Sequence, residues 1–360
     1  MVNWKESMQQ TFEFYEVDPK TWKEIGKIDG ITKCTVNRDD GSETLGSASI
    51  EITDALGECY VREYLVTIQN GVKERHPIGT HMIQTPSSSF NGMYRTVSVD
   101  AYTPLLELKE SPPPLGYSIL KEEAGSPDGT NIMRRAFELT REHCRAPVIE
   151  PNCDKTLSFD FVANTDDTWL TYINDLIKNA NYTIELDEYG KIIFAPVQET
   201  NKMTPVWTFD DGNSSILYSD VTIEHDLYGI PNVVEVVYSN GRDAYNVRVV
   251  NDDPNSPTST VNRGREIVHR DTSPGLYGIP DEAQVKDYAN KLLEALSTVP
   301  YSVSFKHAYC GVKLGDCVRL DYKRAGLDNI NARITSQSID LEPGCPVSAT
   351  AVFTKKLWER

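Results

Sequence analysis

Alternating apolar and polar residues predict that the first part of the chain is β structure. Apolar residues alternate strictly with polar ones over Ser47–Thr53, which is typical of a half-buried strand. Tyr60–Gln69 is a second expected strand, and Asn70-Gly71 after it favours a hairpin because both residues tolerate positive φ. Return strands are expected near 80–85 and over 94–101. Residues 1–110 therefore predict one antiparallel barrel or sandwich.

A proline run then changes the pattern. Ser111-Pro-Pro-Pro114 breaks the alternation and marks a domain boundary. Apolar residues at helical spacing predict helices over 130–143 and 166–180. A hairpin is expected over 182–194, with its turn at an Asp-Glu-Tyr-Gly segment. Residues 111–203 thus form a small α+β domain.

The β pattern returns from residue 204. Further strands are expected at 219–224, 232–238, 301–307, 317–322, 332–340 and 347–353. Asp281 with Gln284 three residues later predicts a capped helix, whose apolar face we expect to pack against the second barrel. Asn251–Pro257 is expected to be a polar surface loop.

The expected fold class is mainly β with an α+β insert. It comprises two antiparallel β-barrels, at 1–110 and 204–360, and inserted small domains. One insert is the α+β domain at 111–203, and a loop and helix at about 251–300 are inserted into the second barrel.

The charge excludes one broad function class. Asp plus Glu number 53 and Lys plus Arg 36, so the formal net charge of the 360 residues is −17. General binding to nucleic acid by phosphate neutralisation needs a basic face. The apolar runs fall well short of the ~20 residues that span a bilayer, and the first thirty residues lack the pattern of a signal peptide.

The seven cysteines form no recognisable metal or disulfide framework. The number is odd and no CxxC occurs, which is typical of free thiols in a reducing compartment. His307, Cys310 and Cys317 have a spacing that fits no standard zinc pattern. We expect no metal and no cofactor.

No catalytic signature is present either. The sequence has no HExxH, GxSxG, Walker loop or GxGxxG. His76 and His81 are five apart, which would put them on opposite faces of a strand. Four pairs of acidic residues are adjacent in the sequence: Asp39-Asp40, Asp166-Asp167, Asp210-Asp211 and Asp252-Asp253. Paired carboxylates serve as catalytic groups in glycosidases, but adjacent acids mostly lie in turns or helix caps.

One basic cluster interrupts the acidic chain. Arg263, Arg265 and Arg270 lie within nine residues. They predict a solvated loop or an interchain salt-bridge patch, and alternatively a site for an anionic partner. The five tryptophans are spread along the chain, so no stacked aromatic platform for a sugar is indicated.

Several segments together resemble the hub proteins of phage tail tips and baseplates, and the hubs of contractile tail-like particles. The resemblance covers nearly the whole chain as a pattern rather than a tight motif. The segments are Gly26–Gly30, Tyr64–Gly71 with Pro77–Gly79, Trp169–Leu176, Asn181–Thr183, Asp187–Gly190, Thr222–Asp226 with Ile230–Val233, Gly264–Glu266, Ala289–Leu296 and Leu314–Leu320.

The resemblance implies a structural protein without enzymatic activity. Its two barrels would be tail-tube-like, and three chains would form a ring whose six barrels continue the tail tube. Implied partners are the tail tube or distal tail protein above, a spike, tip or lysin protein below, the tape measure protein, and DNA only in transit. The implied location is the virion tail tip, after assembly in the host bacterial cytoplasm. Because the long extension of tail-associated lysins is lacking, we expect a stand-alone hub.

A channel for DNA would suit an acidic or neutral wall, since a basic wall would hold the phosphates. Glu51, Asp220 and Glu224 lie on the polar faces of alternating strands and are the candidate channel-lining residues. Two alternative functions are a receptor- or carbohydrate-binding tail component and a cell-wall hydrolase. The first would need exposed aromatics in one groove, and the second would need converging carboxylates or a metal triad.

Overall fold

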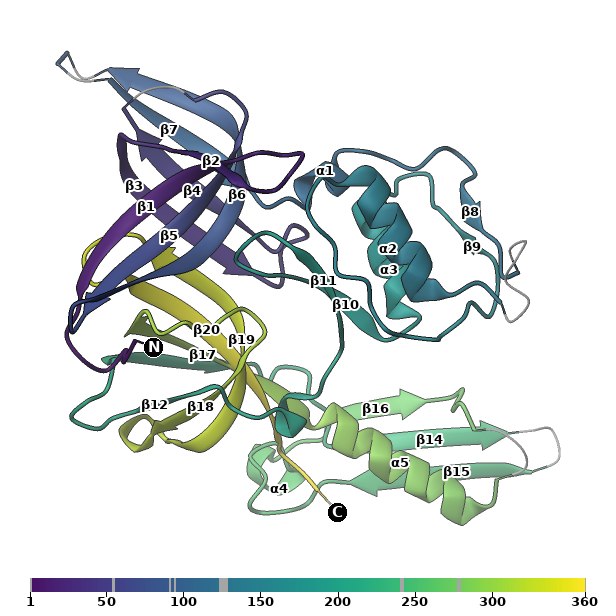
Figure 1. Cartoon of the computed structure of the whole chain (residues 1–360). Coiled ribbons are helices and arrows are strands. Elements are labelled where there is room, and N and C mark those ends of the chain that lie inside the picture. Colours follow the sequence, from purple (N-terminus) through teal and green to yellow (C-terminus); the bar gives the residue numbers. More distant parts are fainter. Residues whose placement is uncertain are drawn as a thin grey trace. The chain divides into compact units, whose positions relative to one another are not determined.

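The chain is mainly β, as the sequence predicts, and folds into two compact units (Figure 1). The computed structural model describes residues 2–53, 56–90, 92–93, 95–122, 129–239, 243–276 and 280–359. The first unit comprises Met1–Val221 and Phe305–Thr350, and the second comprises Thr222–Ser304 and Ala351–Arg360.

The first unit contains most of the elements. Its strands are β1 (Gln9–Val17), β2 (Glu24–Lys27), β3 (Ile31–Asp39), β4 (Gly46–Ile52), β5 (Tyr60–Gln69), β6 (Val72–Phe90), β7 (Arg95–Tyr102), β8 (Ser118–Ile119), β9 (Phe161–Val162), β10 (Tyr182–Leu186), β11 (Ile192–Pro196), β12 (Trp207–Asp210), β18 (Cys317–Tyr322) and β19 (Leu327–Asp340). Its helices are α1 (Leu106–Lys109), α2 (Ile132–His143), α3 (Trp169–Lys178) and the short 3₁₀ helices η1 (Thr200–Lys202) and η2 (Lys323–Ala325). Tyr94, where the sequence pattern starts a strand, lies outside the described residues.

Three strands run from one unit into the other: β13 (Leu217–His225), β17 (Thr298–Ala308) and β20 (Pro346–Lys356). The second unit adds β14 (Val233–Ser239), β15 (Ala244–Val250), β16 (Val268–Asp271), α4 (Thr260–Arg263) and α5 (Glu282–Leu296).

A 13-stranded sheet joins the first part of the chain to the last. Its order is β13-β17-β20-β19-β3-β4-β7-β6-β5-β1-β2, and β18 joins β12 to β19. The antiparallel pairing of β19 with β3, from Ser336↔Asp39 to Asp340↔Thr35, fuses the two β segments. Over the described residues these pairings form an open path rather than closed barrels.

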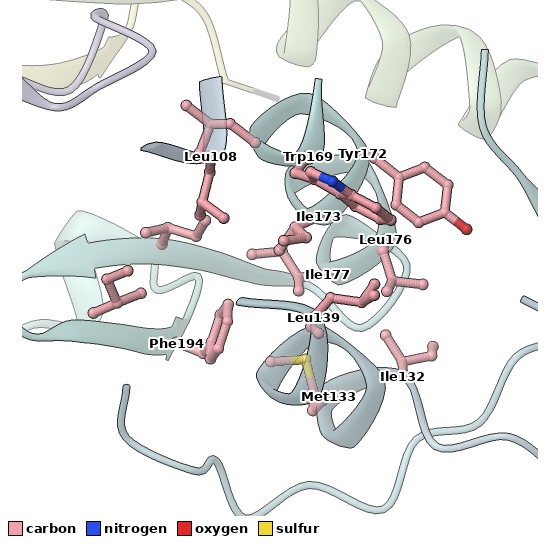
Figure 2. Close-up of a cluster of buried hydrophobic side chains, with 14 of the residues drawn as sticks. Leu108, Ile132, Met133, Leu139, Trp169, Tyr172, Ile173, Leu176, Ile177 and Phe194 are labelled. Atoms are coloured by element: carbon pink, nitrogen blue, oxygen red, sulfur yellow. The ribbon is translucent and has the colours of Figure 1, made fainter. Parts of the chain in front are cut away.

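The α+β insert has a core of its own. Asn131 caps α2 by accepting a hydrogen bond from the Arg134 backbone N–H at 2.8 Å, and a Thr168/Thr171 capping box starts α3. The apolar faces of these helices pack together and against the β10–β11 hairpin (Figure 2). The buried residues labelled in Figure 2 are Leu108, Ile132, Met133, Leu139, Trp169, Tyr172, Ile173, Leu176, Ile177 and Phe194.

Helix α5 begins at the predicted cap but packs elsewhere than expected. Asp281 and Gln284 form the capping box. The apolar face of α5 covers β14 and β15, which belong to a separate three-stranded sheet of order β15-β14-β16. The expectation that α5 packs against the second barrel is therefore wrong, because the Val-rich strand β14 pairs with β15 and β16 instead of joining the large sheet.

The segment expected to be a polar surface loop is in part buried. The side chains of Asn251 and Ser256 are at most 2% exposed. Asn251 donates to the Ser256 hydroxyl at 2.9 Å and also lies within hydrogen-bond distance of Thr258. The prediction took polar composition as a sign of exposure, whereas these polar groups form hydrogen bonds with each other rather than with water.

We predict that Leu293→Ala costs about 2–5 kcal/mol of unfolding free energy, because Leu293 is fully buried between α5 and its sheet. Leu292 and Leu296 on the same helix are only half-buried, so replacing either of them by Ala should cost less. Denaturant unfolding of the three variants measures the loss of unfolding free energy at each position. An equal loss at all three positions would contradict the observed packing.

Candidate functional site: a charged junction at the tip of an inserted hairpin

The candidate channel residues lie on two strands. Glu51 is half-buried on β4, where it pairs with Lys33 and Ser98 across the strands. Asp220 is exposed on β13, and Glu224 is exposed four residues later on the same strand. In the sheet order, β17, β20, β19 and β3 lie between Glu51 and Asp220, so these two carboxylates do not form one cluster.

The three arginines of the basic cluster have different surroundings. Arg263 donates to the carbonyl oxygens of Ile230 at 2.7 Å and Leu227 at 2.8 Å. Arg270 forms an ion pair with Glu235 at 2.7 Å. Arg265 is exposed, and within the described part of the chain its guanidinium has no recorded ion pair.

The adjacent acids lie in turns and caps. One carboxylate of each pair accepts a hydrogen bond from a backbone N–H two or three residues away. These bonds run to Asp39 from Gly41, to Asp167 from Asn164, to Asp210 from Gly212 and to Asp253 from Asn255. Local backbone capping is thus a role that the structure records for every pair, and Asp40, Asp210 and Asp211 also form ion pairs.

The seven cysteines are free, and five of them are buried. Cys310 Sγ lies 3.8 Å from His307 Nδ1, and burial lowers the pKa of His307 to about 4. Among the described residues, no three His, Cys, Asp or Glu side chains are grouped so that they could hold a metal ion. No helix in this described part of the chain is both long and apolar enough to span a membrane.

The strongest concentration of polar contacts surrounds the turn between β10 and β11. Glu188 at this turn forms an ion pair with Lys313 at 2.5 Å, and its other carboxylate oxygen lies 3.7 Å from Arg38. Its backbone carbonyl accepts a hydrogen bond from the Thr80 hydroxyl at 3.2 Å. One residue therefore links the insert to β3, to β6 and to the turn before β18.

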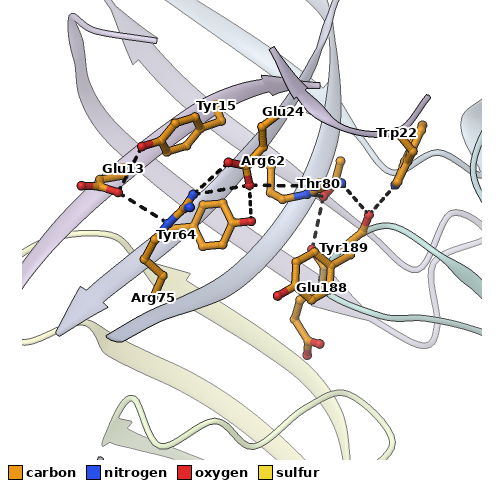
Figure 3. Close-up of polar contacts among 10 residues, drawn as sticks. All are labelled: Glu13, Tyr15, Trp22, Glu24, Arg62, Tyr64, Arg75, Thr80, Glu188 and Tyr189. Atoms are coloured by element: carbon orange, nitrogen blue, oxygen red, sulfur yellow. Dashed lines mark hydrogen bonds and ion pairs between the residues drawn. The ribbon is translucent and has the colours of Figure 1, made fainter. Parts of the chain in front are cut away.

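The next residue, Tyr189, is held by its carbonyl oxygen (Figure 3). That oxygen accepts hydrogen bonds from Trp22 Nε1 at 2.7 Å and Arg62 Nη2 at 3.2 Å. The Arg62 guanidinium also lies over the Tyr189 ring, 5.2 Å from its centroid. Trp22 makes this contact with a φ of 58°, which is unusual for a bulky residue and is tolerated here by the surrounding contacts.

Gly190 completes the turn because no larger residue fits. Its φ is +74°, and an added Cβ would lie 3.1 Å from both Thr80 and Trp22. The sequence predicts this hairpin, but its contacts with Trp22 before β2, with β5 and with β6 have no local signal.

A second arginine extends the junction along the sheet. Arg75 stacks on Tyr64, 3.9 Å from the ring centroid, and pairs with Glu24 at 3.2 Å (Figure 3). The Tyr64 hydroxyl donates to Glu24 at 2.5 Å, and burial together with this bond raises the pKa of Tyr64 to about 12. Glu24 thereby serves both Arg75 and the buried Arg62, which lies 3.9 Å away.

Beside the hairpin tip lies a cleft of about 440 Å³, lined by mixed charges. Burial raises the pKa of Glu185, and the neighbouring Asp316 adds to this shift. Burial also raises the pKa of Asp316, and Glu188 adds to that one. Burial also raises the pKa of Asp40, against the opposing effect of Arg333 at 3.2 Å. The cleft thus keeps several carboxylates partly desolvated around Arg333.

Ile78 is the extra residue of a bulge in β6. Across the strands, His76 pairs with Leu65 and His81 pairs with Val61, which lie on one face of β5. The prediction that the two histidines lie on opposite faces is wrong, because the bulge shifts the alternation by one residue.

The bulge brings His81 to a buried carboxylate that sequence reasoning missed. His81 Nδ1 lies 3.1 Å from the carboxylate of Glu63, whose side chain is 0% exposed. Gly79 makes room for the pair, since an added Cβ would meet the His81 ring at 2.5 Å. The available signal was an Arg62-Glu63 dipeptide inside an otherwise apolar strand that is buried on both faces.

The junction joins parts of the chain through paired charges, stacked rings and carbonyl anchors. Such contacts fix geometry, because hydrogen bonds and ion pairs in a poorly hydrated site are directional. The arrangement therefore suits attachment of the insert to the sheet.

The fold is similar to those of phage tail proteins. The tail protein from Neisseria meningitidis MC58 matches with a TM-score of 0.56 at 13% identity, over 95% of this chain and 96% of that chain. The 43 kDa tail protein of prophage MuSo2 from Shewanella oneidensis matches with a TM-score of 0.60 at 10% identity, over 95% and 98%. No protein-family model matches the sequence, and no curated protein matches it. At these identities the similarity concerns the fold.

We predict that Glu185→Gln stabilises the protein at neutral pH. A raised carboxyl pKa means that the folded chain binds the proton more tightly than the unfolded chain. The contribution of Glu185 to stability therefore falls as the pH rises above its ordinary pKa of 4.5. The gain in the urea midpoint should be present at about pH 7.5 and should shrink at about pH 4, where the parent carboxyl is protonated.

The matched control is Glu150→Gln, which removes an exposed carboxylate of the same insert. It should leave the midpoint nearly unchanged at both pH values. A gain for Glu185→Gln that is equal at the two pH values would show that desolvation of its carboxylate is not the cause.

Proposed function

We propose that the protein is a structural component of a phage or phage-like tail, and specifically the hub of its tip or baseplate. The observation that carries the proposal is the fold similarity to two tail proteins over 95% of the chain. The residue patterns of the hub family point the same way. The proposed role is non-enzymatic.

In this proposal three chains close into a ring, and each contributes two tail-tube-like β segments, at 1–110 and 204–360, flanking the insert at 111–203. Two such segments per chain continue a sixfold tube only when three copies assemble. The fusion of β3 and β19 into one sheet supports this arrangement, because it makes the two segments one mechanical piece.

The ring would connect the tail tube or distal tail protein to a spike, tip or lysin protein, with the tape measure protein and passing DNA in its channel. The protein would lie at the virion tail tip after assembly in the host cytoplasm. The net charge of −17 supports a DNA conduit, since an acidic wall does not retain phosphates.

A receptor- or carbohydrate-binding tail component is the alternative, and a cell-wall hydrolase is a more distant one. Neither has a specific structural observation in its favour. The acid pairs that a hydrolase would use cap turns, and the tryptophans on the described strands and helices lie in separate parts of the fold.

We predict a homotrimer of 40.4 kDa chains in the assembled particle. Electron microscopy of purified protein and of intact tails should show a ring with a central hole at the tail tip. A tip that contains one or six copies would exclude the ring. A compact monomer at the end of a tail fibre would favour the receptor-binding alternative.

We predict that Glu51→Lys together with Glu224→Lys slows DNA release without preventing assembly. Exposed or half-exposed substitutions usually change stability by under about 0.5 kcal/mol. New cations around the ring should retain phosphates, and the effect should be larger at low salt. Ejection kinetics at two ionic strengths measure it.

The control reverses exposed charges in the insert, at Glu150 and Asp166. Kinetics of the Glu51/Glu224 variant that match both parent and control at low ionic strength would place these residues away from the DNA path.

A further inference from the structure

A groove of about 800 Å³ lies between the β1–β2 turn and the end of helix α2. Residues 19–22 line one side of it, and residues 137 and 141–148 line the other. All of them belong to the first unit. None of them lines the cleft beside the hairpin tip, so the groove is a second and separate hollow.

Part of the lining is apolar and ordered. Trp22, Phe137 and Val148 are half-buried and pack against the core of the insert. Pro147 is tied to β11, because its carbonyl accepts a hydrogen bond from the Ile192 N–H at 2.8 Å. A surface that is ordered before a partner binds loses less conformational entropy on association.

The charged part of the lining is mainly basic. Lys20, Arg141 and Arg145 line the groove together with one carboxylate, that of Glu142. This excess is opposite in sign to the net charge of −17 of the chain. A cation in the last turn of a helix is favourable by itself, which accounts for Arg141 at the end of α2. It does not account for Lys20, which reaches the same groove from the β1–β2 turn.

Two of the three cations are available to a partner. Lys20 and Arg141 are exposed, and neither forms an ion pair with any residue that the structure describes. The carboxylate of Asp18, in the same turn as Lys20, accepts hydrogen bonds within that turn, from the Lys20 backbone N–H at 3.2 Å and a neighbouring hydroxyl at 2.6 Å. Arg145 differs, because Glu107 holds its guanidinium at 2.6 Å.

We propose that this basic groove, lined by residues 19–22, 137 and 141–148, docks an acidic segment of a second copy of this chain. Cations beside an apolar lining suit a peptide that carries carboxylates. A net positive groove does not pair with its own counterpart across a twofold axis, because like charges would face each other. The groove of one copy therefore meets a different, acidic face of the next.

A contact between two different faces is the kind that closes a ring of identical chains. The inference rests on the proposed ring, and it names a contact that the ring would use. Charge complementarity favours a second copy as the occupant, since the chain has 53 acidic residues against 36 basic ones and so offers carboxylates on its other surfaces. Duplex DNA is disfavoured, because specific DNA binding commonly uses about six to ten phosphate contacts.

The test is site-specific photo-cross-linking of the purified full chain and of assembled tails. A benzoylphenylalanine replaces Glu142, which lines the groove and is exposed, in one variant. In the control it replaces Lys178, an exposed residue at the end of α3 outside the groove. Cross-linking at 142 should join 40.4 kDa chains to one another, and the control should not. Peptide mapping should place the other end on a segment in which carboxylates outnumber Lys and Arg.

Charge reversal measures the electrostatic contribution. Lys20→Glu together with Arg141→Glu should weaken self-association, followed by sedimentation, by about tenfold or more, and the difference from the parent should shrink at high salt. The matched control, Lys178→Glu with Lys202→Glu, changes the net charge equally at two exposed lysines outside the groove and should have a much smaller effect.

A third variant, Lys20→Arg with Arg141→Lys, keeps both charges and should associate like the parent. Unchanged thermal unfolding of all the variants shows that the effect is not a loss of folding. An equal weakening by the groove variant and its matched control would overturn the proposal, because general repulsion between acidic chains would then explain both.

A cross-link from 142 only to DNA or to a different tail protein overturns the proposal, as does an absence of cross-links both in solution and in tails. The outcome is separable from the proposed function. A ring seen at the tail tip without this cross-link would refute the basic groove alone. Chains cross-linked through 142 in a protein that is missing from tails would refute the hub alone.

Discussion

The buried guanidinium of Arg62 is the constraint around which the first unit is arranged. Its side chain lies on a strand whose two faces are both covered, and it is 5% exposed. A buried cation is tolerated only when its donors are satisfied and a counter-charge is near. Thr80, the carbonyl of Tyr189 and Glu24 meet these needs from three different segments. The position of the inserted hairpin therefore follows from the hydrogen-bonding needs of one strand residue.

The local elements could be predicted from the sequence, and their partners could not. The bounds of Tyr60–Gln69 follow from a run rich in Val, Tyr, Ile and Thr before a turn signal, and the cap at Asp281 follows from side-chain chemistry within a few residues. The pairing of β19 with β3 joins segments about three hundred residues apart, and no local signal encodes it. The bulge at Ile78 likewise depends on tertiary packing, so alternation misplaced His81.

The candidate site was harder to predict because its residues are ordinary in composition. Glu188 and Tyr189 look like turn residues, and only the folded chain shows that they contact Arg38, Lys313 and Trp22. The sequence places Arg263 in a basic cluster, yet in the folded chain its guanidinium donates hydrogen bonds to backbone carbonyls. A polar residue can be hydrated at the surface or hydrogen-bonded to other protein groups. Which of the two occurs depends on partners that are distant in the sequence.

The two units use different chemical groups to hold an irregular segment in one conformation. In the first unit, ion pairs and a stacked arginine fix the hairpin tip, and in the second, Asn, Ser and Thr side chains fix the loop at 251–262. Apolar packing is largely non-directional, whereas a hydrogen bond specifies both distance and angle. Polar groups at both places therefore select one arrangement where an apolar contact would allow several. The carboxylates of Asp40 and Glu185 are partly desolvated beside Arg333, so the same region is not arranged for maximal stability at neutral pH.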